Sequence, residues 1–340
     1  MAKLERVSLA SNSSWERTRG VATRLAFAMC LLTVLRDHAQ SQTSAVPSGQ
    51  NAASYQFSVD VDLVVLPIAV RDRQGRQVPD LRESDFKIYE DHVLQPIRLF
   101  RHEDIPVVAG LLVDHSGSMR PKIAEVIAGA RAFVRSSNPE DRMFVVNFNE
   151  TVSLGLPDAI GFTANADQLE RAIWQAPAVG ETALYDAIVE ALARLQAGGR
   201  DKKVLVVISD GADNASAHSL TQALEMAERS SAIIYVVGLF APDDPDANPR
   251  VLSRLAQATG GEAYFPGEPS AAVEICERIA RDIRNQYTLG YVVPNGKRDG
   301  VYRAIRVDAQ ATGHGKLVAR TRAGYIRGAK PSRPKDEDEK

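Results

Sequence analysis

The spacing of apolar residues changes twice along the chain, and each change marks a boundary. From residue 55 to residue 103 apolar and polar residues alternate, which is typical of half-buried strands. From 104 to 286 unbroken apolar runs of strand length alternate with segments of helical periodicity. From residue 287 the alternating pattern returns, in 287–293, 302–309 and 316–322. We therefore expect an α/β region flanked by strand-rich segments.

The central region predicts a doubly wound, mostly parallel α/β sheet with helices on its faces, as in Rossmann-like folds. Apolar runs that carry no polar alternation are typical of strands buried on both faces of a parallel sheet. Three such runs are expected at 105–113, 203–208 and 232–237, with a hairpin at the sheet edge over 143–149 and 151–156. Helices are expected over 123–134, 167–176, 182–197, 219–229, 251–259 and 271–284.

The two strand-rich segments, 55–103 and 287–327, are predicted to form one discontinuous β-rich module. Each offers few strands, and a small isolated sheet with one apolar face is marginal in water. Within the first segment, 85–89 and 95–100 are expected to pair. Since the termini of a domain usually lie close together, residues 104–286 can interrupt such a module as an inserted domain.

The first 45 residues are expected to be a secretory signal peptide. An apolar run over 25–35 follows three arginines and is shorter than the roughly 20 residues of a membrane-spanning helix. Cleavage is expected after Ala45 or nearer Ala39, while retention as an anchor and lipidation of Cys30 are the alternatives. Residues 46–54 read as a linker and 328–340 as a disordered charged tail. The chain is therefore expected in the periplasm or outside the cell, with membrane contact only if the signal segment is retained.

Composition excludes several classes of function. The 340 residues are 44% hydrophobic, enough for an ordinary core, and the formal net charge of −2 argues against a nucleic-acid-binding surface. Two cysteines cannot build a disulfide framework or a zinc site. Cys276 falls on the apolar face of an expected helix, so it is predicted to be buried.

Candidate chemistry is concentrated where the first buried strand ends. Asp114, Ser116 and Ser118 place one carboxylate and two hydroxyls on a tight turn at the carboxyl end of a central strand, where open α/β sheets bind ligands. Hard oxygen donors suit Mg²⁺, Mn²⁺ or Ca²⁺ better than zinc or copper. Asp and Ser are also ordinary turn residues, so the turn alone is weak support. Thr182, before a helix, and Asp210, after another buried strand, strengthen it.

Together, Asp114, Ser116, Ser118, Thr182 and Asp210 resemble the metal-ion-dependent adhesion site of von Willebrand factor type A domains. The resemblance covers about residues 104–286. It implies that Mg²⁺, or Mn²⁺ or Ca²⁺, is held by the serines directly and often by the aspartates through water, with one position open. The flanking phrases VDLVVLPIAVRDRQGRQVPDL, DFKIYEDHVLQPIRLF, YTLGYVV and RAGY, with DHSGSM, also resemble the von Willebrand factor A-related family common in acidobacteria.

The function that this resemblance implies is adhesion or scaffolding without catalysis. An acidic side chain of a partner protein is the natural ligand for the open metal position. A metal-dependent phosphate or ester hydrolase is one alternative, and a structural domain with a vestigial site is another. The hydrolase reading lacks a positioned base, because His115 is expected to point away from the metal and no Gly-x-Ser-x-Gly elbow is present.

Overall fold

The computed structural model describes residues 63–326 apart from 174–176, 201, 241–246 and 294–299. All elements described below lie in one unit of the chain, residues 58–340. The predicted signal peptide (1–45), linker (46–54) and tail (328–340) fall outside the described residues, as does the start of the first expected strand.

A six-stranded sheet forms the centre of the α/β region, in the order β10-β9-β8-β5-β6-β7. All neighbouring strands in it are parallel except β6 and β7, so the predicted doubly wound, mostly parallel sheet is confirmed. Its strands are β5 (Val108–Asp114), β6 (Arg142–Phe148), β7 (Val152–Leu154), β8 (Lys203–Ser209), β9 (Ala232–Gly238) and β10 (Ala263–Tyr264).

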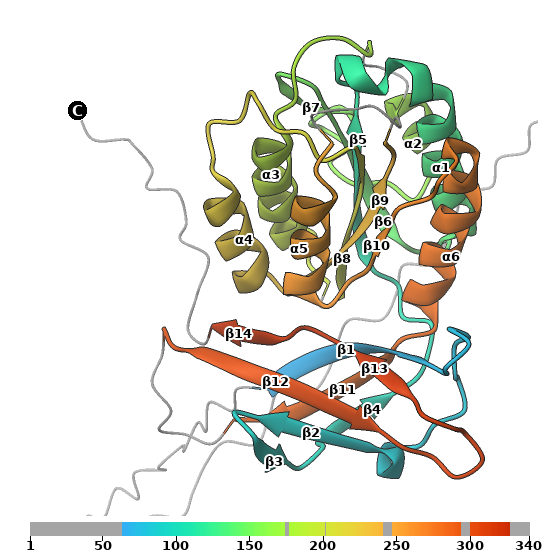
Figure 1. The fold of residues 1–340 in the computed structure, drawn as a ribbon, viewed down its shortest axis with the longest axis vertical. Coiled ribbons are helices and arrows are strands. Elements are labelled where there is room, and N and C mark those ends of the chain that lie inside the picture. The colour runs from blue at the N-terminus through green and yellow to red at the C-terminus, as the bar shows by residue number, and fades with distance from the viewer. Residues whose placement is uncertain (1–62, 174–176, 201, 241–246, 294–299, 327–340) are drawn as a thin grey trace, which may run out of the picture. The chain divides into compact units, whose positions relative to one another are not determined.

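Helices cover both faces of this sheet (Figure 1). Helices α1, α2 and α6 lie against one face, and α3, α4 and α5 lie against the other. They are α1 (Ile123–Ser136), α2 (Ala166–Ile173), α3 (Leu184–Ala197), α4 (Leu220–Arg229), α5 (Pro249–Thr259) and α6 (Ala272–Arg284), with short 3₁₀ helices η1 (Glu83–Asp85), η2 (Gly117–Lys122) and η3 (Pro269–Ala271). One expectation is corrected, because the helix predicted from residue 182 begins only at Leu184.

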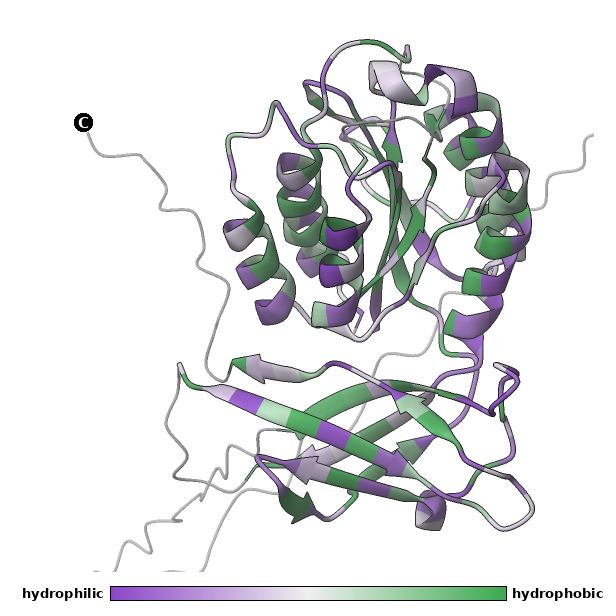
Figure 2. Ribbon diagram, in the orientation of Figure 1, coloured by the Kyte–Doolittle hydropathy of each residue, from purple (hydrophilic) through white to green (hydrophobic). Residues whose placement is uncertain are grey.

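The central strands are apolar without alternation because both of their faces are covered. Every residue of β5 and of β9 is buried, and Leu112 and Val236 have no exposed surface. The helices show apolar residues toward the sheet and polar residues outward (Figure 2). Cys276 on α6 is fully buried as expected, and burial raises the pKa of its thiol to about 12.

Strands from the two flanking segments pair with each other in two antiparallel four-stranded sheets. Their orders are β13-β1-β11-β4 and β14-β12-β2-β3, so each sheet combines strands that precede and follow the α/β region. The strands are β1 (Leu63–Arg71), β2 (Phe86–Glu90), β3 (Val93–Gln95), β4 (Leu99–Arg101), β11 (Tyr287–Val292), β12 (Tyr302–Ala309), β13 (Val318–Arg320) and β14 (Gly324–Ile326). That the two sheets form one discontinuous β-rich module remains a prediction.

The expected strand over 95–100 is wrong, because the chain changes sheets within it. Strand β3 pairs with β2, but β4 pairs with β11 in the other sheet. Pro96 lies between the two strands and has no N–H to donate to a ladder. The expected strand over 316–322 is also shorter than predicted, and an additional strand, β14, follows it.

Ion pairs and hydrogen bonds connect these sheets to the α/β region. Arg71 on β1 lies 3.0 Å from Glu262 and also pairs with Asp282 on α6. The Arg322 guanidinium donates to the Ser230 carbonyl, 2.6 Å away, just after α4. Among the residues that the structure describes, no helix combines the length and apolar character needed to cross a bilayer.

Candidate metal centre

The predicted metal turn lies where the order of strands reverses. The chain passes from β5 to β6 on one side of it and later returns to β8 on the other side. Asp114 is the last residue of β5, and Asp210 directly follows β8. Since the carboxyl ends of parallel strands share one edge of a sheet, both carboxylates lie at the switch point where open α/β sheets bind ligands.

Asp114 is buried and held by hydrogen bonds to both carboxylate oxygens. Its Oδ1 accepts the Ser116 N–H at 2.8 Å, and its Oδ2 accepts the Ser209 hydroxyl at 2.6 Å. The residue has no exposed surface, and this burial raises the pKa of its carboxyl to about 6, with repulsion from Asp210 acting in the same direction. The carboxylate is therefore fixed in orientation, with lone pairs left for a water or a metal ion.

The two serines of the turn join Asp114 to Asp210. The hydroxyl oxygens of Ser116 and Ser118 lie 3.1 Å apart. The Ser118 hydroxyl in turn donates to Asp210 Oδ2 at 2.6 Å. Four of the five predicted oxygen donors therefore form one hydrogen-bonded cluster, which comes from two neighbouring strand ends.

The backbone positions the fifth predicted donor, Thr182, beside the turn. The Gly117 N–H donates to the Gly180 carbonyl at 2.9 Å, two residues before Thr182. The Thr182 N–H donates to Asn214 Oδ1 at 2.7 Å, and the threonine is only 3% exposed. Gly180 has φ +83°, a left-handed conformation that favours glycine. This connection runs through main-chain atoms, whereas the side chains of Ser116, Ser118 and Asp210 are linked directly.

Three further residues that contact the predicted donors were not predicted from the sequence. Ser209 orients Asp114, Asn214 holds the Thr182 segment, and Lys122 Nζ lies 3.5 Å from Asp210 Oδ2. Ser209 could have been suspected, because it precedes Asp210 at the end of an apolar run. The approach of Lys122 depends on the 3₁₀ turns of η2, which the apolar pattern does not reveal.

The donor set fits a hard divalent ion. Two carboxylates and three hydroxyls are oxygen ligands of the kind that Mg²⁺, Mn²⁺ and Ca²⁺ prefer. The described residues hold no group of three or more His, Cys, Asp or Glu side chains arranged to bind a metal. An ion at this turn would therefore depend on the hydroxyls of Ser116, Ser118 and Thr182 as well as on the two aspartates.

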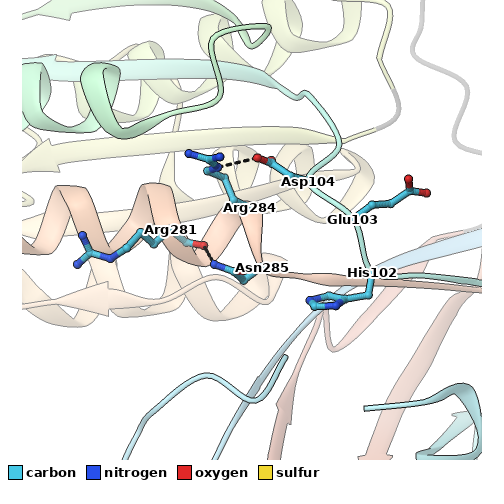
Figure 3. A pocket seen from close by; sticks show the side chains of 6 residues that line it. All are labelled: His102, Glu103, Asp104, Arg281, Arg284 and Asn285. Carbon is cyan, nitrogen blue, oxygen red and sulfur yellow. Dashed lines mark hydrogen bonds and ion pairs between the residues drawn. The ribbon is translucent and has the colours of Figure 1, made fainter. Parts of the chain in front are cut away.

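The His115 ring contacts β6, and the surface pocket of Figure 3 lies away from the turn. The His115 ring is buried, and its Nε2 lies 3.1 Å from Asn147 Oδ1 on β6. The pocket lies near the amino end of β5, a strand's length from Asp114, and Arg284 in it lies 2.7 Å from Asp104 (Figure 3). It is lined by His102, Glu103, Asp104, Arg281, Arg284 and Asn285.

Three solved structures that are similar to the chain are a von Willebrand factor type A protein, the von Willebrand factor domain of a pilus protein and a TRAP protein. One from Catenulispora acidiphila is 14% identical, with a TM-score of 0.49 over 71% of this chain and 73% of that one. The domain of the type V pili tip protein Mfa5 from Porphyromonas gingivalis is 13% identical, with a TM-score of 0.44 over 53% and 95%. Manganese-loaded TRAP protein from Plasmodium vivax is 16% identical, with a TM-score of 0.41 over 71% and 100%.

Sequence comparison finds a family match within the α/β region. No curated protein sequence matches the chain. Residues 110–212 match the von Willebrand factor type A domain, and this span contains all five predicted donors, from Asp114 to Asp210. The predicted resemblance to the von Willebrand factor type A family is therefore confirmed for residues 110–212.

Proposed function

We propose that the protein is an exported adhesion or scaffold module that captures an acidic side chain of a partner protein through a divalent ion. The ion, Mg²⁺ or alternatively Mn²⁺ or Ca²⁺, is held by Asp114, Ser116, Ser118, Thr182 and Asp210. The observation that carries this proposal is the hydrogen-bonded cluster of four oxygen donors at the switch point of the sheet.

The chemistry of the donors supports capture of a carboxylate. Three of the five are neutral hydroxyls, so a divalent ion keeps affinity for a further anionic ligand. When bound, the ion supplies that affinity, while the chain fixes the ion at the sheet edge through Asp114 and Asp210. A partner with an exposed Asp or Glu is the corresponding ligand.

A hydrolase is the less supported alternative. Metal-assisted hydrolysis needs a base placed to activate the attacking water. The imidazole beside the turn is buried and hydrogen bonded to Asn147, and in this proposal the Asp114 carboxylate holds the ion. We therefore propose a binding function without catalysis.

The test is a pull-down from envelope extract with the purified chain, with Mg²⁺ and with EDTA in its place. Specific partners should be retained only with Mg²⁺, and Asp114→Asn should lose them. Calorimetry on the same protein should show one bound ion per chain at millimolar Mg²⁺ or Mn²⁺. Retention of the same proteins in EDTA would exclude a metal-dependent contact.

Export is part of the proposal and rests on the apolar run after an arginine-containing start. Processed protein is expected in the periplasm or the medium. Full-length, unprocessed protein in the cytoplasmic fraction would contradict it.

A further inference from the structure

Lys122 places a buried positive charge against the candidate metal centre. It is the last residue of η2, only 4% exposed, and its Nζ lies 3.5 Å from Asp210 Oδ2. The same ammonium group donates to the Leu239 carbonyl at 2.8 Å, just beyond β9. A buried ammonium is costly unless it has such partners, so its position beside Asp210 is fixed from two elements of the fold.

Lys122 and Ser118 lie beside the same carboxylate oxygen of Asp210. Asp210 Oδ2 accepts the Ser118 hydroxyl and lies beside the Lys122 ammonium. Asp114 and Asp210 are both fully buried and repel each other. Lys122 lowers the net charge of this group from two negative charges to one, so it stabilises the carboxylate pair when no ion is bound.

The Lys122 ammonium stabilises the empty site, but it repels a metal ion that enters the site. Repulsion between a fixed ammonium and a divalent ion is weakly screened in a buried site. With the ion bound, the two carboxylates, Lys122 and the ion together carry one net positive charge. That charge favours the carboxylate of a partner as the ligand that neutralises the site.

We propose that Lys122 is an internal counter-ion of the metal centre, which stabilises the centre without metal and sets the metal affinity by opposing the bound ion. This inference rests on the proposed function, because it takes the Asp114–Asp210 cluster to be the metal site. Lys122 is thus an affinity-determining residue that is not itself a ligand.

The test compares the full chain with its Lys122→Met variant, which keeps the length of the side chain and removes its charge. The dissociation constant for Mg²⁺, measured by calorimetry, should fall at least tenfold, about 1.4 kcal/mol. In EDTA the variant should melt at a lower temperature than the wild type. Saturating Mg²⁺ should narrow that difference, because an ion that binds the folded state more tightly stabilises it more.

Lys202→Met is the matched control. Lys202 is also buried, at 8% exposure, but it precedes β8 and is separated from Asp210 by the whole length of that strand. Its removal should leave the Mg²⁺ affinity unchanged. Should Lys122→Met not fold, Lys122→Gln retains a donor for the Leu239 carbonyl without the charge and should show the same tenfold gain.

The possible results separate this inference from the proposed function. Equal Mg²⁺ affinity in the wild type and the Lys122 variants would overturn the counter-ion role and leave the metal site in place. Binding by the variants alone would support the counter-ion role and contradict metal binding by the native chain. No binding by either protein would overturn both.

Discussion

Asp114 lies deeper than a residue at the rim of a sheet. It has no exposed surface, and both of its oxygens accept hydrogen bonds, from Ser116 and Ser209. Truncation to alanine would therefore leave two buried donors without an acceptor, at a cost of about 1–3 kcal/mol each. Asparagine is the better substitution, because it keeps the shape of the side chain and one carbonyl oxygen.

Asp114→Asn should lower the Mg²⁺ affinity at least tenfold, or about 1.4 kcal/mol, because it removes one of the two negative charges at the site. The measurement is calorimetry at fixed pH, with a thermal melt to verify folding. Asp141→Asn is the control, since Asp141 is a buried carboxylate that accepts the Val107 N–H at the other end of β5. A comparable loss in both variants would mean that the effect is not local to the turn.

Because of Lys202, the free energy of unfolding should change with pH in the alkaline range. Its Nζ donates to the Ile283 carbonyl, and burial lowers the pKa of its ammonium group to about 8, although Asp104 and Asp141 act to raise it. Between that value and the ordinary 10.5 the unfolded chain binds more protons than the folded one, so the free energy of unfolding rises with pH in this window. Below pH 8 the full cost of the buried charge is present.

Between pH 8 and 10.5 the free energy of unfolding of the wild type should rise by about 3 kcal/mol relative to that of Lys202→Met. Denaturant unfolding of both proteins at several pH values measures it, and the comparison cancels the titration of other groups. A difference in stability that stays constant over this range would show that the ammonium titrates normally.

At the level of single residues, the sequence predicted the oxygen donors but not their environment. Asp114, Ser116, Ser118 and Asp210 could be selected as candidates because each stands at the end of an apolar run or in a tight turn. Lys122 could not, because its contact with Asp210 depends on the path of η2 and on a carbonyl beyond β9. Such contacts depend on tertiary structure, and no periodic pattern of apolar residues in the sequence reveals them.

At the level of elements, the apolar pattern predicted the buried strands well and the short ones poorly. Strands β8 and β9 are unbroken apolar runs, because helices cover both faces of the sheet. Strands β3 and β4 have three residues each, too few to establish a period, and they belong to different sheets. Which partner a short strand takes depends on the fold and not on its own residues.

Gly260 at the end of α5 gives a prediction at this scale. It has φ +80°, and a Cβ atom there would lie 2.2 Å from the backbone carbon of Thr321. Gly260→Ala should therefore cost more than about 2 kcal/mol, since it adds a clash with main-chain atoms to the strain of a left-handed residue. Thermal unfolding of the full chain measures the loss.

Gly313→Ala is the control for that substitution. Gly313 has φ +88°, but a Cβ atom there would meet nothing within 4 Å. Gly313→Ala should lose only the stability that a left-handed alanine costs, about 1–2 kcal/mol. Equal losses at the two positions would mean that the segment around Thr321 moves away without cost.

At the level of the whole molecule, the mixed composition of the two small sheets predicts that neither flanking segment folds alone. Strand β1 pairs with β11, and β2 pairs with β12, so the first segment lacks the partners of its main strands without the second. Residues 55–103 and 287–327, expressed separately, should show no cooperative melt by circular dichroism. Cooperative folding of either one would contradict a single discontinuous module.

The same two segments joined by a short glycine–serine linker should fold. Asp104 and Arg284, near the two ends of the α/β region, form an ion pair of 2.7 Å, so the ends to be joined are close together. If the joined chain remained unfolded, the sheets would need the α/β region for their stability, for example through the contacts of Arg71 with Glu262 and Asp282.

The position of β1 between two antiparallel neighbours has a mechanical consequence. Six of its residues are in register with β11 and three with β13. A pull on Leu63 that is directed along β1 would load the ladders with β11 and β13 together. Because the hydrogen bonds of an antiparallel ladder run perpendicular to its strands, such a load shears many of them at once and does not open them one by one. Strand β1 is thus arranged to resist tension along its own axis.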